Sequence, residues 1–249
     1  MKGILLRVGI DQTYGSWNAP VDPISNEFVY FPIPDECSDF TNGMKTEYEL
    51  FRGDLETFAS DKGISEVLHF PAWLENECCH LDPDFSTLSY GDQGVGRGNK
   101  IGRLEKGDFI AFFASLKPTA PCQHNLIYAL IGIYFVDKLE KAIQVEDVDC
   151  YKNAHTRRQV ISETDLVVTA DASRSGRFTR SIPIGELRRN AYRVTEELLE
   201  VWGGLDIKDG FIQRSINPPS FLDPQRFLNW LSEMRPEYIH SNNLVKYEN

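Results

Sequence analysis

Two long apolar runs constrain the fold of this chain more than any other feature of its 249 residues. They read FIAFFASL at 109–116 and LIYALIGIYFV at 126–136, and turn-forming residues bound both. Neither run reaches the roughly 18 apolar residues that a membrane-spanning helix needs. Short apolar runs rich in β-branched and aromatic residues are typical of strands that are buried on both faces. The sequence therefore predicts a sheet with two such strands at its centre and no membrane span.

Three further strands are expected outside these two runs. The stretch GILLRVGID at 3–11 alternates in polarity, so that Ile4, Leu6, Val8 and Ile10 fall on one face and polar residues on the other. This pattern predicts a strand with one polar face. The other two expected strands are EFVYFPIP at 27–34 and LVVTA at 166–170.

The clearest helical pattern lies at 186–201, where apolar residues recur at helical spacing and two glycines follow as a stop. Another helix is expected to start at Asp223 and Pro224, a capping residue followed by proline at the first position, and to end near Met234. A third is expected at 45–62. The apolar face of the first consists of Leu187, Ala191, Val194, Leu198 and Val201.

Strands precede helices more often than they alternate with them, and no internal repeat or low-complexity linker is present. This order predicts one α+β domain over residues 1–249, with a mixed sheet or a small barrel as its core and flanking helices. The helices near the C-terminus are expected to form a helical extension over about 186–249.

The five cysteines are odd in number and include no C-x-x-C pair. Neither a disulfide framework nor a cysteine zinc site is therefore expected, and this usage favours a reducing, cytoplasmic location. The N-terminus shows no pattern of a cleaved signal peptide.

Charge is unevenly distributed along the chain. Residues 151–193 contain nine Lys or Arg against four Asp or Glu, although the whole chain has a net charge of −11. Arginine side chains match the geometry of phosphate oxygens, so this segment predicts a local anion site rather than a generally basic surface. The alternative is a solvated basic face. The arginines expected to hold phosphate are Arg157, Arg158, Arg174 and Arg177.

The stretch HLDPDF places His80, Asp82 and Asp84 two residues apart. In an extended segment the three side chains point to one side, where an imidazole and two carboxylates can hold a cation or exchange protons. Alternatively, the aspartates cap turns around Pro83 and the histidine is packed. Arg7 and Asp11, on the polar face of the first strand, are expected to converge with this cluster on one polar cleft.

Several motifs together resemble a known family. The similarity covers roughly residues 2–185 and is carried by the order of the motifs along the chain. They are RVGID, HLDPDF, YGD, LEKGDFIAFFASL, LIYALIGIYFV, NAHTRR and LVVTADASRS. In this combination the chain resembles the nucleotide-modification-associated domain families, specifically the third of the series. The KGD turn followed by a long apolar strand is also similar to small PUA-type β-barrels, which read modified bases.

The resemblance implies an association with phage and microbial systems that modify nucleotides or DNA bases. It implies functional roles for the matching positions, which are Arg7, Asp11, His80, Asp82, Asp84, Tyr90, Asp92, Asn153, His155, Arg158, Arg174 and Ser175.

Two interpretations follow. In the first, the chain acts on a nucleotide or on a flipped or single-stranded base, with the arginines holding phosphate and with His80, Asp82, Asp84 and His155 supplying acid–base or metal chemistry. In the second, it is a non-catalytic reader of modified bases or a partner-binding subunit. Tyr14, Trp17 and Tyr90 are candidates for stacking on a base in either case. The patterns identify no particular cofactor and no oligomeric state.

Overall fold

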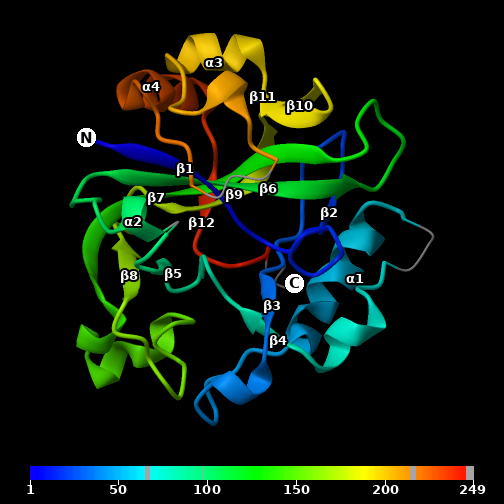
Figure 1. Cartoon of the computed structure of the whole chain (residues 1–249). Helices are drawn as coiled ribbons and strands as arrows, with labels where there is room; N and C mark the ends of the chain where they lie inside the picture. The colour runs from blue at the N-terminus through cyan, green and yellow to red at the C-terminus, as the bar shows by residue number, and fades with distance from the viewer. Residues whose placement is uncertain (65–67, 97, 214–216, 245–249) are drawn as a thin grey trace.

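The computed structural model describes residues 1–64, 68–96, 98–213 and 217–244. An open, mixed sheet crosses the middle of the molecule, as Figure 1 shows, and the expectation of an α+β fold is confirmed. The strands of the main sheet are β1 (Gly3–Arg7), β2 (Pro20–Val21), β5 (Ser89–Gln93), β6 (Phe109–Pro118), β7 (Ile127–Lys141), β8 (Asp165–Ala170), β9 (Gly176–Pro183) and β12 (Tyr238–Ile239).

The main path of the sheet runs in the order β1-β6-β7-β8-β5, and three short branches join it. Strand β1 lies parallel to β6, whereas β6, β7, β8 and β5 are antiparallel to their neighbours. The three strands expected at the start of the chain and in the two apolar runs therefore share one sheet, as predicted. The first of them ends at Arg7 rather than at residue 11, because Gly9 adopts a φ of 79° that breaks the extended backbone.

The two apolar runs are buried on both faces because the sheet separates two hydrophobic clusters. Ile110 and Phe112 of β6 belong to one cluster, whereas Phe109 and Phe113 belong to the other. This alternation places each apolar residue of the run in one core or the other and explains why the run shows no polar face. The sheet is therefore the middle layer of the fold.

The upper layer in Figure 1 is made from the C-terminal part of the chain. It contains the hairpin β10 (Gly185–Arg188) and β11 (Ala191–Val194), followed by α3 (Glu196–Trp202) and α4 (Pro224–Met234). Asp223 caps α4 by accepting a hydrogen bond from the backbone of Arg226, as the sequence predicts for this start. Trp202 and Phe227 lie at the centre of this layer, with ring centroids 5.2 Å apart.

The prediction of one helix over 186–201 is wrong for its first half, which forms the hairpin β10–β11, and only α3 is helical. Arg189 and Asn190 have φ values of 53° and 60°, and this left-handed pair forms the two-residue loop between β10 and β11. Leu187, expected on the buried helix face, is 58% exposed. Tyr192 instead stacks on Tyr128 of the sheet at 4.3 Å, so packing of an aromatic pair overrides the helical spacing.

The lower layer holds α1 (Arg52–Asp61) and a small ribbon of β3 (Ile33–Asp35) and β4 (Cys78–His80), with several 3-10 turns. The helix expected at 45–62 forms only from Arg52 onward, after a 3-10 turn at Tyr48–Phe51. The strand expected at 27–34 is largely irregular and pairs as a strand only in β3. A short helix, α2 (Gly98–Ile101), follows β5.

A disulfide joins Cys37 to Cys78 beside this ribbon, with a Cα–Cα distance of 5.0 Å. The sequence predicted no disulfide framework, but this single disulfide forms because folding brings together two cysteines that lie 41 residues apart in the sequence. The other three cysteines, Cys79, Cys122 and Cys150, are free.

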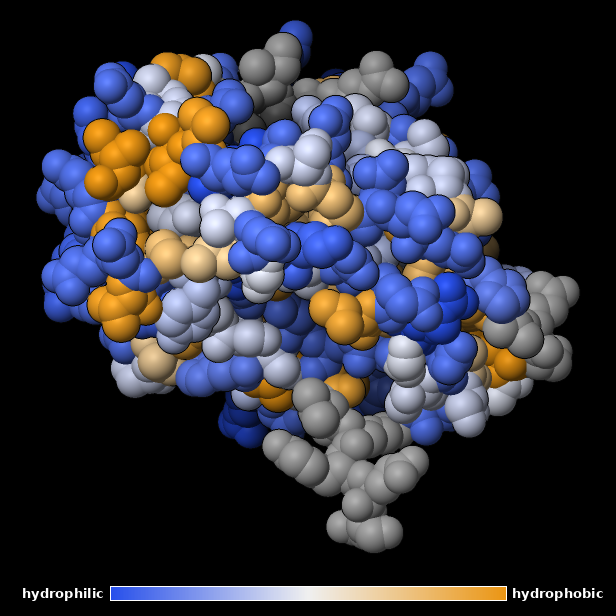
Figure 2. Space-filling view, turned by 90° about the horizontal axis from the view of Figure 1, so that it is seen from below, coloured by the Kyte–Doolittle hydropathy of each residue, from blue (hydrophilic) through white to orange (hydrophobic). Residues whose placement is uncertain are grey.

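Figure 2 shows the molecule from below the view of Figure 1, and hydrophobic residues on this face lie in separate groups among hydrophilic ones. Among the helices of the described residues, none has the length and apolar character needed to cross a bilayer.

Candidate functional site

A cleft of about 710 Å³ opens where β1, the β3–β4 ribbon and the β5–β8 pair approach one another. The connecting strand is β7, whose first half pairs with β6 and β9 and whose second half pairs with β8 after a register shift. The polar residues that line the cleft include Arg7, Asp11, Thr13, Asp35, His80, Asp82, Asp92, Gln93, His155, Arg158, Ser162 and Asp165.

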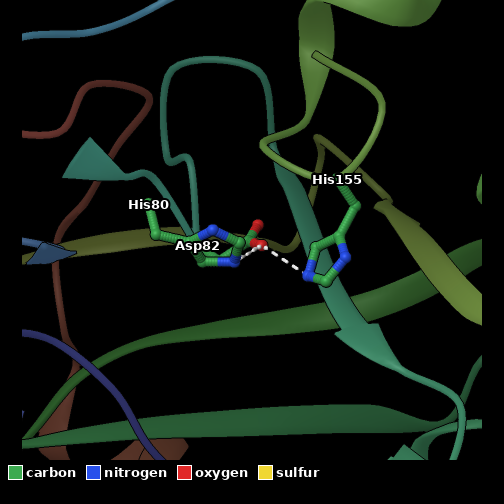
Figure 3. Close-up of side chains that lie close together, drawn as sticks. All are labelled: His80, Asp82 and His155. Atoms are coloured by element: carbon green, nitrogen blue, oxygen red, sulfur yellow. Dashed lines mark ion pairs between the residues drawn. The ribbon is translucent and has the colours of Figure 1, made fainter. Parts of the chain in front are cut away.

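Three side chains from distant parts of the chain meet in the cleft. Asp82 lies just beyond the end of β4, and His80 is the last residue of that strand. His155 comes from the loop after the 3-10 helix Asp147–Lys152. The Nε2 atoms of His80 and His155 lie 3.0 Å and 3.4 Å from Oδ2 of Asp82, so that both imidazoles face one carboxylate oxygen (Figure 3).

A second carboxylate fixes each imidazole from behind. Oδ2 of Asp35 lies 2.8 Å from Nδ1 of His80, and Oδ2 of Asp165 lies 2.6 Å from Nδ1 of His155. With Nδ1–H donating to these carboxylates, the Nε2 atom of each ring is directed at Asp82 and the cleft. Each histidine is thereby held in one orientation.

Asp82 is held by its other oxygen. Oδ1 accepts hydrogen bonds from the backbone N–H of Gly91 at 3.0 Å and from Nδ2 of Asn153 at 2.8 Å. Oδ2 is buried and faces the two imidazoles. Asn153 also accepts a hydrogen bond from the backbone N–H of His155, so one amide side chain positions two members of the cluster.

The Y-G-D motif lies on strand β5, and its glycine makes room for the cluster. A Cβ atom at Gly91 would lie 2.6 Å from Oδ1 of Asn153 and closer still to Cδ2 of His155. The absence of a side chain therefore allows Asn153 and His155 to approach the strand.

Electrostatics in the cluster favour a charged His80. Burial alone would lower its pKa, but the neighbouring carboxylates of Asp35 and Asp82 outweigh this effect and raise the pKa to about 9. In the metal-free protein His80 is therefore protonated at neutral pH.

The two arginines in the cleft are already paired with carboxylates. Nη2 of Arg7 lies 2.5 Å from Oδ2 of Asp11, and Nη1 donates to the carbonyl oxygen of Gln213. Arg158 donates to Asp35 and, over 3.1 Å, to Asp39. Arg7 therefore pairs with Asp11, and Arg158 adds to the group of charges behind His80.

The mouth of the cleft is more apolar than its floor. Tyr14, Val95 and Val160 line it and are 55%, 52% and 83% exposed. Tyr90 also lines the cleft, but it is buried, and its hydroxyl donates to Asp92 over 2.7 Å. Trp17 packs edge-on against Phe31 at 5.1 Å and does not line the cleft.

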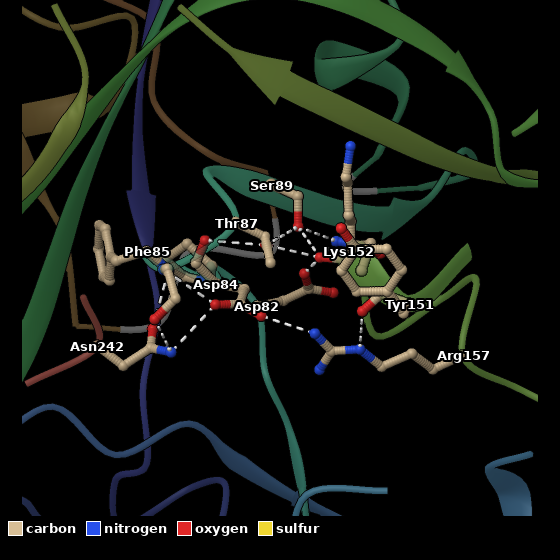
Figure 4. A network of polar contacts seen from close by, with 12 residues as sticks. Asp82, Asp84, Phe85, Thr87, Ser89, Tyr151, Lys152, Arg157 and Asn242 are labelled. Atoms are coloured by element: carbon tan, nitrogen blue, oxygen red, sulfur yellow. Dashed lines mark hydrogen bonds and ion pairs between the residues drawn. The ribbon is translucent and has the colours of Figure 1, made fainter. Parts of the chain in front are cut away.

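Asp84, expected to join His80 and Asp82, points elsewhere. Its Oδ2 accepts a hydrogen bond from Nη2 of Arg157 at 2.8 Å, and its Oδ1 accepts one from Asn242 at 3.0 Å (Figure 4). The alternation of an extended segment does not continue past the end of β4, so Asp82 and Asp84 face different surroundings. Asp84 and Arg157 form a buried pair outside the cleft.

The four arginines of the expected phosphate site are not brought together. Arg157 pairs with Asp84, whereas Arg158 lines the cleft. Arg174 lies exposed over the ring of Phe135 and pairs with Asp171. Arg177 is fully buried and donates to the carbonyl oxygen of Phe28 over 2.6 Å. Ser175 is buried too, and its hydroxyl accepts a hydrogen bond from the backbone of Phe135.

Two residues that the sequence interpretation missed, Asp35 and Asp165, support the histidines. Asp165 could have been noticed in the sequence, because it is an acidic residue at the start of the apolar strand β8. In the structure it is only 4% exposed. Asp35 could not have been noticed in this way, since it follows two prolines and an isoleucine in an ordinary loop sequence.

Within the described part of the chain, the donors of His80, Asp82 and His155 form a group that could hold a metal ion. Two imidazole nitrogens and a carboxylate oxygen suit divalent ions such as Zn²⁺ and Fe²⁺. Without a metal, the same atoms could exchange protons with a bound molecule.

A family model described as nucleotide modification associated domain 3 matches residues 2–202. No curated protein and no solved structure matches the chain.

Proposed function

The chain belongs to the nucleotide modification associated domain 3 family, and on this premise we propose that it is an enzyme that acts on a nucleobase in the cleft. The observation that carries this proposal is the pair of imidazoles, each fixed by its own carboxylate, that face Asp82 at the floor of an open cleft. Burying several ionisable groups costs stability, and such arrangements cluster at functional sites. A protein that only recognises a base has no need of them.

The charge of the cleft favours a base over its phosphates. Five aspartates and two arginines are among the described residues that line it, and both arginines have carboxylate partners. A phosphate charge about 6 Å from one uncompensated carboxylate is repelled by about 3 kcal/mol at an effective dielectric constant of about 20. We therefore place the base in the cleft and the sugar and phosphate outside it.

The apolar mouth supports the same orientation. Tyr14, Val95 and Val160 would contact the flat faces of a base that passes between them. A base in a duplex reaches such a cleft only when it is extruded, so the expected substrate is a nucleoside or a base in a single or locally opened strand.

The test is to incubate the protein with nucleosides, nucleotides and single-stranded oligonucleotides and to analyse the digested products by mass spectrometry. We expect a changed nucleoside with the wild type and with His124→Ala, an exposed histidine outside the cleft. We expect none with His155→Ala. If wild type and His155→Ala give identical products from every substrate, the enzyme proposal is wrong.

The alternative is a reader of modified bases, which the exposed Tyr14 at the mouth also fits. A reader would bind its base equally well with His155→Ala, provided that the variant folds, and would lose binding when Tyr14 is replaced. Measuring both binding and product formation with the same variants separates the two functions.

A further inference from the structure

We propose that His80, Asp82 and His155 bind one divalent transition-metal ion through Nε2, Oδ2 and Nε2. Binding of the ion stands on geometry alone, and only its use in catalysis rests on the proposed function. The three ligand atoms lie within 4.8 Å of one another.

The separations around Asp82 are those of ligands that share an ion. Ligands about 2.1 Å from a tetrahedral or octahedral ion lie roughly 3.0–3.4 Å apart. The Nε2 atoms of His80 and His155 lie 3.0 Å and 3.4 Å from Oδ2 of Asp82. Both rings face the same oxygen, and their planes are nearly perpendicular to each other, with an interplanar angle of 82° (Figure 3).

A second observation is the burial of the Asp82 carboxylate. The residue is 7% exposed, and Oδ1 is fully used by Gly91 and Asn153. Oδ2 is buried and faces the two imidazole Nε2 atoms, at 3.0 Å and 3.4 Å. A cation between this oxygen and the two imidazoles would be held by all three atoms.

The carboxylates that contact the two histidines are arranged as they are around the ligands of a metal centre. Asp35 and Asp165 each lie within hydrogen-bonding distance of the Nδ1 atom of a histidine. In metal sites, such carboxylates orient the imidazole, fix its tautomer and raise its basicity. Here both histidines have one, and the two carboxylates come from different strands, β3 and β8.

The chain supplies three ligands on one side, so the remaining coordination positions face the cleft. Three protein ligands with an open position are the arrangement of catalytic rather than structural sites. An ion there would polarise an oxygen or a water molecule next to a base held at the mouth.

The experiment uses the full chain, stripped with a chelator and then titrated separately with Zn²⁺, Co²⁺ and, without oxygen, Fe²⁺. We expect one ion per chain and, for Co²⁺, the visible ligand-field absorption of a nitrogen- and oxygen-bound ion. His155→Ala and Asp82→Ala should weaken binding more than 100-fold, whereas His124→Ala should bind as the wild type does. Asp35→Asn and Asp165→Asn should keep one site and weaken it by roughly 10–100-fold.

Circular dichroism of each metal-free variant shows whether it folds, and the wild-type Co²⁺ spectrum is decisive even where a variant does not. A wild type that binds less than a tenth of an equivalent of every ion overturns the proposal. So does a folded His155→Ala that binds as tightly as the wild type. A metal-loaded protein that changes no nucleoside would leave this site standing and refute only the proposed function.

Discussion

The guanidinium of Arg157 donates a hydrogen bond to the carboxylate of Asp84 over 2.8 Å, in the interior and outside the cleft. Removing one partner of a buried ion pair leaves the other charge uncompensated, at a cost of about 3–5 kcal/mol. Asp84→Asn should therefore lower the free energy of unfolding by about this amount, measured by urea denaturation, and leave metal affinity in the folded protein unchanged. A stable Asp84→Asn protein that no longer binds metal would instead place Asp84 in the site.

Gly91 should be essential for the cluster because a side chain there would collide with His155 and Asn153. We expect Gly91→Ala to displace both residues and to weaken metal binding at least tenfold, measured by titration calorimetry. Gly53→Ala is the matched control, since a Cβ atom there meets nothing within 4 Å and the residue lies in α1. This control should bind metal normally and be as stable as the wild type or slightly more so.

The loop at Arg189 and Asn190 offers a test of the hairpin β10–β11. Both residues have positive φ, and glycine is favoured at the second position of such a loop. Asn190→Gly should raise the free energy of unfolding by up to about 1 kcal/mol. If residues 186–201 were one helix, the same change would lower it, so the sign of the shift in thermal or urea denaturation distinguishes the two structures.

The pKa of His80, raised to about 9 in the metal-free protein, predicts a pH dependence of stability. Because the folded value lies above the ordinary 6.5, the stabilisation is complete below pH 6.5 and is lost as pH rises through about 9. The loss should be at most about 3–4 kcal/mol. It is measured as the difference between wild type and His80→Gln in urea denaturation with chelator present. A difference that does not change across this range would contradict the raised pKa.

Tyr14 should contribute to binding of a base at the mouth of the cleft. Replacing an aromatic side chain that stacks on a base costs about 1–3 kcal/mol. Tyr14→Ala should therefore weaken nucleoside binding about 5- to 150-fold, measured by calorimetry or fluorescence. Tyr151→Ala is the matched control, because Tyr151 is similarly exposed, at 53% against 55%, but does not line the cleft. Equal effects of the two changes would argue against stacking at Tyr14.

Much of the central sheet could be predicted from local sequence. Strands β6 and β7 follow from apolar runs that only a doubly buried strand explains, and α4 follows from the Asp223 cap and Pro224. These signals hold because hydrophobic burial and capping act over a few neighbouring residues. The same reasoning failed at 186–194, where Tyr192 packs on Tyr128 of the sheet, a partner that local spacing does not contain.

The sequence by itself determined that this chain forms an α+β fold and that His80, Asp82 and His155 are candidates for chemistry. Only the tertiary structure decided that Asp82 faces the cleft while Asp84, two residues later, is buried against Arg157. The partners responsible are distant, since Asn153 lies 71 residues from Asp82 and Arg157 lies 73 residues from Asp84. The surroundings of a carboxylate depend on which distant hydrogen-bond donors the fold brings to it. The spacing of neighbouring residues in the sequence does not contain these donors, so they could not be predicted from it.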